Sequence, residues 1–294
     1  MIKIDLHIHS KDGSDGRWHL EEIFREASIR GINLISITDH DSISSQREAA
    51  GLAQKYRMSY ITGVELNVTF NHPEFTEGKD ISLDFLGYNF DPDNKTLVSK
   101  LAELSSYRRK RALIILENLN SELSGEGKNI LGEDDIRKIQ ERTEGAIGRP
   151  HIADYLIERG IVKNRQEAFD RYLVRLNLPK MHLSLEEASN LIRGAGGLLF
   201  LAHPDDPNGT SLRAVSADLS IQQKAIESSM LDNINGIECW HSRLTPKATD
   251  SYLAFARRHG LLVSGGSDCH QQPVLMGNLE IPAFVAGNFG INSF

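Results

Sequence analysis

Short β-rich segments recur along the 294-residue chain, and amphipathic helical patterns separate them. Strands that alternate with helices are typical of βα units with mostly parallel pairing. Seven such segments favour a closed or nearly closed barrel, although a doubly wound open sheet has the same alternation. The segments are KIDLHIH, NLISITDHD, YITGVELNV, ISLDFLGYNF, GLLFLAHP, GIECW and LLVSGGSDCH.

The helical patterns between these segments carry ordinary start and stop signals. One pattern ends at Gly31, and another begins with the capping box that Ser184 and Glu187 form. A third begins with a Thr-Pro pair and ends at Gly260. Each is predicted to be a helix that crosses from one strand to the next.

The alternation of strand and helix breaks between residues 94 and 183, where helical patterns follow one another. A stretch of this length is too long for a loop between a strand and a helix. We therefore expect residues 1–93 and 184–294 to form a barrel domain. Residues 94–183 are expected to form a helical insertion, or cap, over the C-terminal face of that barrel.

Composition and charge narrow the classes of partner. The chain carries 33 basic and 40 acidic residues, and its net charge of −7 argues against non-specific binding to nucleic-acid phosphates, so no stable binding of duplex nucleic acid is expected. Its two cysteines are too few for a disulfide framework or a thiolate zinc cluster. With no apolar leader and no run of about 18 apolar residues, we expect a cytoplasmic protein that does not bind a membrane.

Polar residues stand where the strands end. In the first strand Asp5, His7 and His9 alternate and so share one face. In a barrel the C-terminal ends of all strands share the face where catalytic sites are built, so residues that are distant in sequence would meet there. The candidate ligands are His7, His9, Asp15, His40, Glu65, Asp84, His203, Asp268 and His270.

Imidazole and carboxylate donors without thiolate suit Zn²⁺, Mn²⁺ or Fe²⁺. Nine candidates exceed the need of one ion, so two or three divalent ions are implied, with Glu65 as a natural bridge. Asp5 is predicted to hold a ligand imidazole in the correct tautomer. The alternative, that these residues are ordinary paired polar groups, requires ionisable side chains to be buried at strand after strand without a metal.

With these residues in place the sequence resembles the PHP (polymerase and histidinol phosphatase) family of metal-dependent phosphoesterases. The resemblance covers nearly the whole chain, through DLHIHS, the SDG loop, ITDHD, GVELN, LGYNFDP, GRPHIA, LAHP and GSDCH. Within the family the chain is similar to the branch with a helical insertion and an RPHIA motif, which includes nucleoside 3',5'-bisphosphate phosphatases and 5'-to-3' oligoribonucleases.

The resemblance implies a distorted (β/α)7 barrel with a trinuclear metal site. It implies a first metal held by His7, His9, Glu65 and Asp268. It implies a second held by Glu65, Asp84 and His203, and a third held by Asp15, His40 and His270. One departure is Asp84 in DFLGY, where this branch usually has His. A carboxylate adds negative charge there and could change the metal preference or occupancy of the second position.

The expected reaction is hydrolysis of a phosphate ester by a metal-bridging hydroxide, because clustered metals activate water and neutralise phosphoryl oxygens. The predicted catalytic residues are Glu65, His203 and His270, where either histidine, or a metal-bound water, could protonate the leaving oxygen. The chain has no P-loop and no GxSxG motif that would indicate a different chemistry.

Substrate contacts are expected mainly from the insertion. Arg149 and His151 in GRPHIA follow a glycine turn, and Arg149 could hold a second phosphate with its planar fork. Arg108 and Arg111 are three residues apart and share a helix face, which either lines the cleft or is solvated. His241 follows the sixth strand and could also reach the cleft.

We therefore expect an enzyme that acts on a small nucleotide, namely a nucleoside 3',5'-bisphosphate, or on a short single-stranded 5'-phosphorylated oligonucleotide. Histidinol phosphate is an alternative substrate for the same chemistry. Two alternatives belong to other classes: an amidohydrolase-like metal hydrolase and a non-catalytic module that binds nucleotides.

Overall fold

The computed structural model describes residues 2–140 and 148–291, and its strands form two sheets. A three-stranded parallel sheet contains β1 (Lys3–Asp5), β2 (Ile32–Ile35) and β3 (Ser59–Tyr60). The five-stranded sheet contains, in spatial order, β4 (Gly63–Phe70), β5 (Ile81–Tyr88), β6 (Leu198–Leu201), β7 (Gly236–His241) and β8 (Leu262–Gly266). In this sheet β5 pairs antiparallel with both β4 and β6, whereas β6, β7 and β8 are parallel. The fold is therefore mixed α/β.

The two sheets approach each other through isolated contacts. The Leu6 amide, just after β1, donates a hydrogen bond of 3.1 Å to the carbonyl of Gly265 in β8. Isolated parallel bridges join Ile8 to Cys269 and His40 to Glu65. These contacts make no continuous ladder around the described residues, so the closed (β/α)7 barrel is not confirmed. The physical reason is that β4 and β5 pair as an antiparallel hairpin while β1 to β3 are very short.

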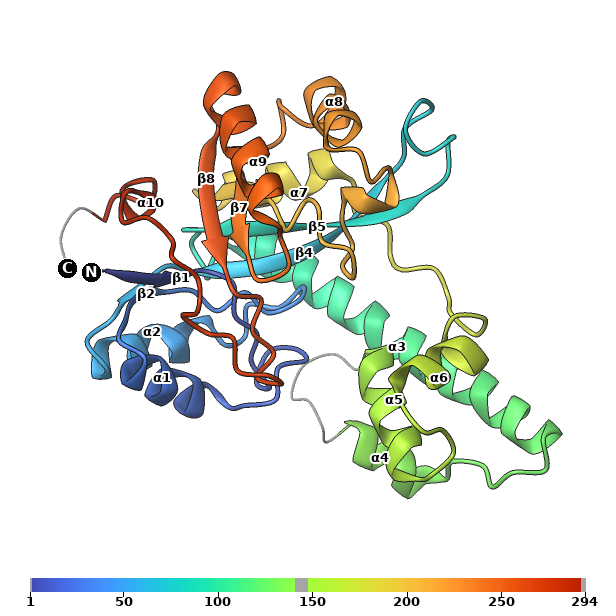
Figure 1. Cartoon of the computed structure of the whole chain (residues 1–294). Helices are drawn as coiled ribbons and strands as arrows, with labels where there is room; N and C mark the ends of the chain where they lie inside the picture. The colour runs from blue at the N-terminus through green and yellow to red at the C-terminus, as the bar shows by residue number, and fades with distance from the viewer. Residues whose placement is uncertain (1, 141–147, 292–294) are drawn as a thin grey trace.

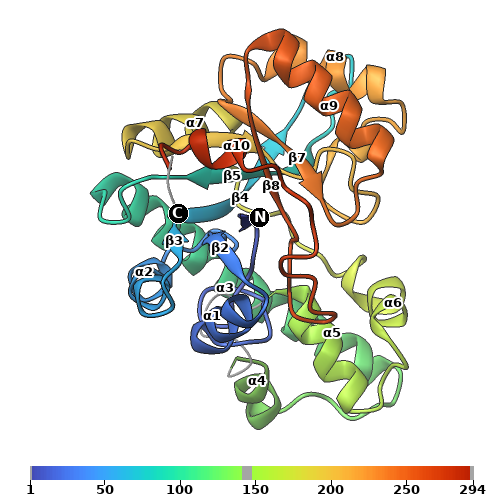
Figure 2. The ribbon, with the colours of Figure 1, turned by 60° about the vertical axis from the view of Figure 1, so that its left-hand side comes forward.

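Helices cover the sheets on two sides (Figures 1 and 2). The helices α1 (Leu20–Ile29) and α2 (Gln46–Lys55) lie beside the three-stranded sheet, and α7 (Leu185–Gly194), α8 (Leu219–Ser229) and α9 (Pro246–His259) lie on the other side of the molecule. A short α10 (Phe284–Gly287) follows near the end of the chain. Within the described ranges no helix is both long enough and apolar enough to cross a bilayer.

Two of the predicted helix signals are present, although Ser184 and Glu187 form only one half of the predicted capping box, since the Glu187 side chain pairs with Lys100. The Ser184 hydroxyl accepts the amide of Glu187 at 3.1 Å, which caps the N-terminus of α7. At the C-terminus of α9, Gly260 has φ of 65°, the left-handed conformation in which glycine commonly ends a helix.

The region between β5 and α7 is helical. It contains α3 (Lys95–Gly125), α4 (Glu133–Gln140), α5 (Arg149–Glu158), α6 (Arg165–Ala168) and a π-helical turn (Phe169–Leu173). Figure 1 shows α3 running from beside the sheets to the far end of this region. Leu116, Leu119 and Tyr172 belong to an apolar cluster that is separate from the core at the sheets. The domain boundaries at residues 94 and 183 stay a prediction.

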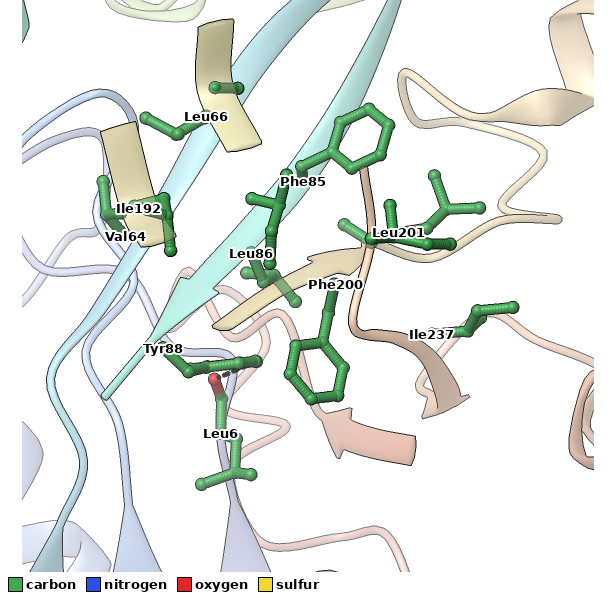
Figure 3. Packing of buried hydrophobic residues seen from close by; sticks show 14 of the residues in the cluster. Leu6, Val64, Leu66, Phe85, Leu86, Tyr88, Ile192, Phe200, Leu201 and Ile237 are labelled. Atoms are coloured by element: carbon green, nitrogen blue, oxygen red, sulfur yellow. Dashed lines mark hydrogen bonds between the residues drawn. The ribbon is translucent and has the colours of Figure 1, made fainter. Parts of the chain in front are cut away.

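The main core lies between the five-stranded sheet and its helices (Figure 3). Val64, Leu86 and Phe200 are fully buried there, and Ile192 of α7 packs against the same sheet. The Tyr88 hydroxyl donates a hydrogen bond of 2.8 Å to the Leu6 carbonyl, which ties β5 to the end of β1. This packing fixes the strand ends, where the candidate ligands begin.

Candidate metal centre and substrate cleft

Four predicted ligands from three distant strands meet in one buried group. His7 and His9 follow β1, Glu65 lies on β4 and Asp268 follows β8. Asp268 Oδ1 lies 3.4 Å from His7 Nε2 and 3.1 Å from His9 Nε2. Glu65 Oε2 lies 3.5 Å and 3.3 Å from the same two nitrogens. The structure therefore brings together the residues of the first predicted metal position.

A second group lies on the other side of His9. Asp15 Oδ1 is 3.1 Å from His270 Nε2, 3.7 Å from His40 Nε2 and 4.0 Å from His9 Nδ1. The ligand atoms of these four residues lie within 4.8 Å of one another. Because His40 Nδ1 is also 3.0 Å from Glu65 Oε2, this group shares an edge with the first.

The donor atoms of both groups fit divalent ions. His7 Nε2, His9 Nε2, Asp15 Oδ1 and Glu65 Oε2 are buried and have no hydrogen-bond partner in the described structure. A buried polar atom without a partner is costly, and most such atoms in proteins are satisfied. Ions at these positions would satisfy all four atoms, and nitrogen and oxygen donors without sulfur suit Zn²⁺, Mn²⁺ or Fe²⁺.

The electrostatics of the groups favour the ionised form of each carboxyl. Burial alone would raise the pKa of Asp268, but the His7 and His270 imidazoles hold it well below its usual range. Burial opposes ionisation of Glu65 in the same way, and the His40 and His7 imidazoles likewise hold its pKa well below the usual range. The carboxylates are therefore ready to bind cations without first losing a proton.

The partner of the His7 ring is a residue that the sequence interpretation missed. Glu238 Oε1 accepts the His7 Nδ1–H at 3.0 Å, and Glu238 Oε2 accepts the His203 amide at 2.8 Å. The prediction that Asp5 holds a ligand imidazole is wrong, because Asp5 instead accepts backbone amides such as that of Ser267 at 2.9 Å. The available signal for Glu238 was a lone acidic residue in the apolar strand GIECW.

The loop that carries Asp15 is held by a buried carboxylate. Asp39 accepts the Ser10 amide at 2.7 Å and the Ser14 hydroxyl at 2.8 Å. Gly13 packs directly against this carboxylate, and a Cβ added there would come within 2.0 Å of Asp39 Oδ2. The loop can thus adopt this path only with glycine at that position, and the path places Asp15 beside His270.

Arg243 is a second residue that the sequence interpretation missed. Its Nε and Nη2 donate to the buried Asp206 carboxylate at 2.8 Å and 2.6 Å, and Nη2 also donates to Asp268 Oδ2 at 2.5 Å. The fork-shaped pairing fixes the guanidinium in orientation. Arg243 thereby holds the outer oxygen of Asp268 while it lines the cleft described next.

A cleft of about 380 Å³ lies between the strand ends and the helical region. This volume falls within the usual range for small-molecule sites, about 300–1,000 Å³. Residues of both ligand groups form one side of the cleft. Its lining includes Asp15, His40, Glu65, Asp84, His203, Asp268 and His270 together with Leu104, Tyr107, Arg108, Arg111, Arg149, Lys180 and Met181.

The predicted arginines reach the cleft with different partners. Arg108 forms an ion pair with Asp41, the residue after His40. Arg111 donates to the Leu178 carbonyl at 2.7 Å, and Arg149 donates to the Leu173 carbonyl at 3.3 Å. Burial, followed by the charges of Arg149 and Arg108, lowers the pKa of Arg111 to about 10. Positive charge is therefore concentrated on the helical side of the cleft.

Two predicted substrate residues lie outside the lining of this cleft. His151 Nδ1 accepts the Gly148 amide at 2.9 Å, which places the ring at the start of α5. His241 is buried behind the first ligand group, with Nε2 3.4 Å from Asp268 Oδ2. His203 does line the cleft, and its Nε2 lies 2.9 Å from Glu65 Oε1. Asp84 Oδ2 is 4.0 Å from the same nitrogen.

Several known proteins with similar sequences are named as hydrolases. The chain is 28% identical over 277 residues to a 3',5'-nucleoside bisphosphate phosphatase of Chromobacterium violaceum. The matched region covers 92% of this chain and 88% of that protein. It is 31% identical over 208 residues to a 5'-3' exoribonuclease of Haemophilus influenzae, which covers 69% of each protein. It is also 28% identical over 281 residues to the 5'-3' exoribonuclease Rnm of Escherichia coli, which covers 91% of this chain and 85% of that protein.

Solved structures and a family match agree with this result. A protein assigned as a metal-dependent phosphoesterase from Bifidobacterium adolescentis has a TM-score of 0.79 and 28% identity, and the match covers 98% of this chain and 95% of that one. A Chromobacterium violaceum protein described as an amidohydrolase has a TM-score of 0.75 and 26% identity, and covers 96% of this chain and 92% of its own. Residues 5–168 match the PHP domain family. The chain therefore belongs to the PHP domain family, and it is a hydrolase of the metal-dependent phosphoesterase class.

Proposed function

We propose that this enzyme hydrolyses phosphate esters of nucleotides, either a nucleoside 3',5'-bisphosphate or a short 5'-phosphorylated oligonucleotide. The observation that carries the proposal is the position of unpaired cations in the cleft that also contains the ligand groups. Arg111, Arg149 and Lys180 line this cleft. No carboxylate among the described residues lies within 4.0 Å of their charged nitrogens.

Unpaired cations in a cleft favour an anionic ligand. Arg108 and Arg243 also line the cleft, but their charges are offset by Asp41 and by Asp206 with Asp268. A phosphate bound near Arg149 would supply the missing negative charge, and a guanidinium fork matches phosphate oxygens well. A substrate with a second phosphate, distant from the one that is cleaved, would satisfy both sides of the cleft.

Apolar side chains on the helical side support a nucleotide over a simple phosphate. Leu104, Tyr107 and Met181 line the cleft beside the arginines. Tyr107 is 39% exposed, and its hydroxyl donates to the Pro179 carbonyl at 3.1 Å. Aromatic rings of this kind stack on nucleobases without selecting a sequence. The names of the similar phosphatase and exoribonucleases support the same substrate class.

For the metal centre, we assign one ion to His7, His9, Glu65 and Asp268 and another to Asp15, His40 and His270, with Glu65 adjoining both. Divalent ions bound there would supply Lewis acidity that activates water and neutralises the phosphoryl oxygens. Glu238 keeps the His7 Nε2 lone pair directed at the site by accepting the proton on Nδ1. Arg243 restrains Asp268 and adds positive charge at the wall of the cleft.

Two imidazoles border the cleft at positions from which they could transfer a proton to the leaving oxygen. His203 Nε2 lies beside Glu65 Oε1, and His270 Nε2 lies beside Asp15 Oδ1. Glu65 stabilises a proton on His203, since burial lowers the pKa of this imidazole but the neighbouring carboxylate raises it to about 9. His203 is therefore our candidate for the general acid, because His270 Nε2 is assigned above to a metal ion and an imidazole nitrogen carries no proton while it ligates.

The test is product analysis with Mn²⁺-loaded protein on three substrates: adenosine 3',5'-bisphosphate, adenosine 5'-monophosphate and a short 5'-phosphorylated RNA. His9→Ala protein, prepared in the same way, accounts for contaminating activity. We expect turnover of the bisphosphate or the RNA and much weaker turnover of the monophosphate, which cannot use the cations on the helical side.

The products distinguish the two nucleotide reactions. Inorganic phosphate from the bisphosphate alone would identify a nucleotide phosphatase, and stepwise release of mononucleotides from the RNA would identify an exonuclease. If neither substrate is hydrolysed by the wild type, the nucleotide proposal fails. Histidinol phosphate and then amide substrates would be assayed next.

A further inference from the structure

We infer that this chain binds two divalent ions per molecule. Asp84 does not ligate a third ion, and instead holds neighbouring side chains of the cleft wall in place. The inference rests on the metal centre assigned above. It concerns the second of the three metal positions that the family resemblance implies, namely Glu65, Asp84 and His203.

Both carboxylate oxygens of Asp84 already have fixed donors. The Asn67 side-chain amide donates to Oδ1 and the Thr210 hydroxyl donates to Oδ2. Asn67 is held in place because it pairs directly with Asp84 across β4 and β5. Thr210 is held in place because its carbonyl accepts the Asp84 amide at 3.1 Å. Asp84 is therefore satisfied without a metal ion.

The ligand atoms of the other two positions differ in this respect. His7, His9, Asp15 and Glu65 each have a buried ligand atom with no hydrogen-bond partner among the described residues. At the second position His203 Nδ1 is also without one, but the nitrogen that faces Glu65 is Nε2, and neither oxygen of Asp84 is left without a partner. The groups of side chains that could hold an ion omit Asp84, and the group that contains His203 is completed by Glu65 and His7. The atoms that would ligate an ion at the second position are Glu65 Oε1, His203 Nε2 and the Asp84 oxygens, and all have partners. The first and third positions each contain at least one ligand atom that has none.

Without Asp84, the second position has too few protein ligands. His7 cannot supply a nitrogen there, since Nδ1 is bonded to Glu238 and Nε2 lies in the first group. What remains is Glu65 Oε1 and His203 Nε2, which lie 2.9 Å apart and already bond to each other. Metal sites of this kind normally use three or four protein ligands, so two are insufficient for tight binding.

A cation of the protein faces Asp84 from across the cleft. Lys180 lines the cleft with Asp84 and has no carboxylate partner within 4.0 Å among the described residues. Burial and the Glu65 charge raise the pKa of Asp84, and the Lys180 ammonium acts in the opposite direction. The positive charge of Lys180 disfavours a third divalent ion at this position and stays available to a substrate phosphate.

The experiment counts metal ions directly and needs no substrate. Wild-type, Asp84→Asn, His9→Ala and Asp80→Asn proteins are loaded with Mn²⁺, freed of unbound ions by gel filtration, and analysed by native mass spectrometry and by elemental analysis. Asn at position 84 preserves the shape of the side chain, and thermal unfolding checks that the variant is folded. Asp80 is an exposed carboxylate just before β5 and serves as the matched control.

We expect two ions per chain in the wild type, in Asp84→Asn and in Asp80→Asn, and fewer than two in His9→Ala. A third ion in the wild type, or the loss of any ion in folded Asp84→Asn, would overturn the inference. A wild type with fewer than two ions would also overturn it, and would count against the metal centre itself. If the nucleotide proposal fails, the metal counts are unchanged, so a failure of the substrate assignment can be distinguished from a failure of the two-ion inference.

Discussion

The two sides of the cleft are constructed in different ways. On the strand side the proposed ligands are buried or partly buried, and their orientation is fixed by partners that are themselves buried, such as Glu238 behind His7 and Asp39 behind the loop of Asp15. On the helical side Arg111 and Arg149 are held by backbone carbonyls and are left without a carboxylate partner among the described residues.

The difference follows from what each side has to do. Ligand atoms must converge on a point to within a fraction of an ångström, so their supports have to be rigid. A cation that attracts a phosphate acts over a longer range and tolerates movement of its side chain. Under the proposed function, the strand side therefore determines the chemistry, and the helical side determines which phosphate ester is used.

The largest expected effect comes from breaking the strand side at its centre. His9 contributes Nε2 to one ligand group and Nδ1 to the other. His9→Ala is expected to lower kcat about 1,000-fold or more, equivalent to ~4 kcal/mol of barrier. Steady-state kinetics with saturating Mn²⁺ measure this, and near-normal kcat would show that His9 is not in the catalytic centre.

A smaller effect is expected from changing a residue that orients a proposed ligand but does not itself contact an ion. Glu238→Gln removes the charge that the His7 imidazole faces, and such outer partners typically contribute about 10-fold to 100-fold in metal affinity. Calorimetric titration of metal-free protein provides the comparison. Glu227→Gln, at an exposed site on α8, is the control and should bind metal like the wild type. Unchanged affinity in Glu238→Gln would contradict the role of rigid supports.

Breaking the helical side should change substrate affinity and leave the chemistry intact. Arg149→Ala is expected to raise KM for adenosine 3',5'-bisphosphate about 10-fold, because a hydrogen bond to a charged group contributes ~1.5 kcal/mol or more. Metal content and kcat should stay at wild-type values. Arg175→Ala removes an exposed arginine of the same region, paired with Glu122, as a control. A fall in kcat with constant KM would place Arg149 in the reaction itself.

The smallest expected effect tests whether the comparison extends to ordinary structural residues. Ser184→Ala removes the N-cap of α7 and should lower the free energy of unfolding by about 1 kcal/mol. Denaturant unfolding measures the loss, and metal content and kinetics should not change. Altered metal binding would mean that α7 influences the ligands through the core.

The two sides were also unequally predictable from the sequence. The proposed ligand set could be predicted because histidines and carboxylates at strand ends are expensive to bury without a metal, and because DLHIHS and GSDCH place them by simple alternation. The supports were less visible. Asp5 and Glu238 are both acidic residues in apolar strands, and only the three-dimensional arrangement shows that Glu238 contacts His7.

The direction of the strands explains why the closed barrel is not confirmed. Periodicity identifies strands but does not fix their direction, and the β4–β5 hairpin pairs antiparallel along its whole length. The partners of Arg108 and Arg243 were unpredictable for a related reason. Asp41 and Asp206 lie 67 and 37 residues away from them in sequence, and local spacing carries no information about such pairs.

The separate apolar cluster of the helical region has an evolutionary consequence. Because Leu116, Leu119 and Tyr172 pack among themselves and not in the core at the sheets, substitutions there leave the ligand supports in place. Mutations that reshape the helical side can accumulate while hydrolysis at the strand ends is retained. One inherited centre can thereby acquire new substrates without passing through an inactive intermediate.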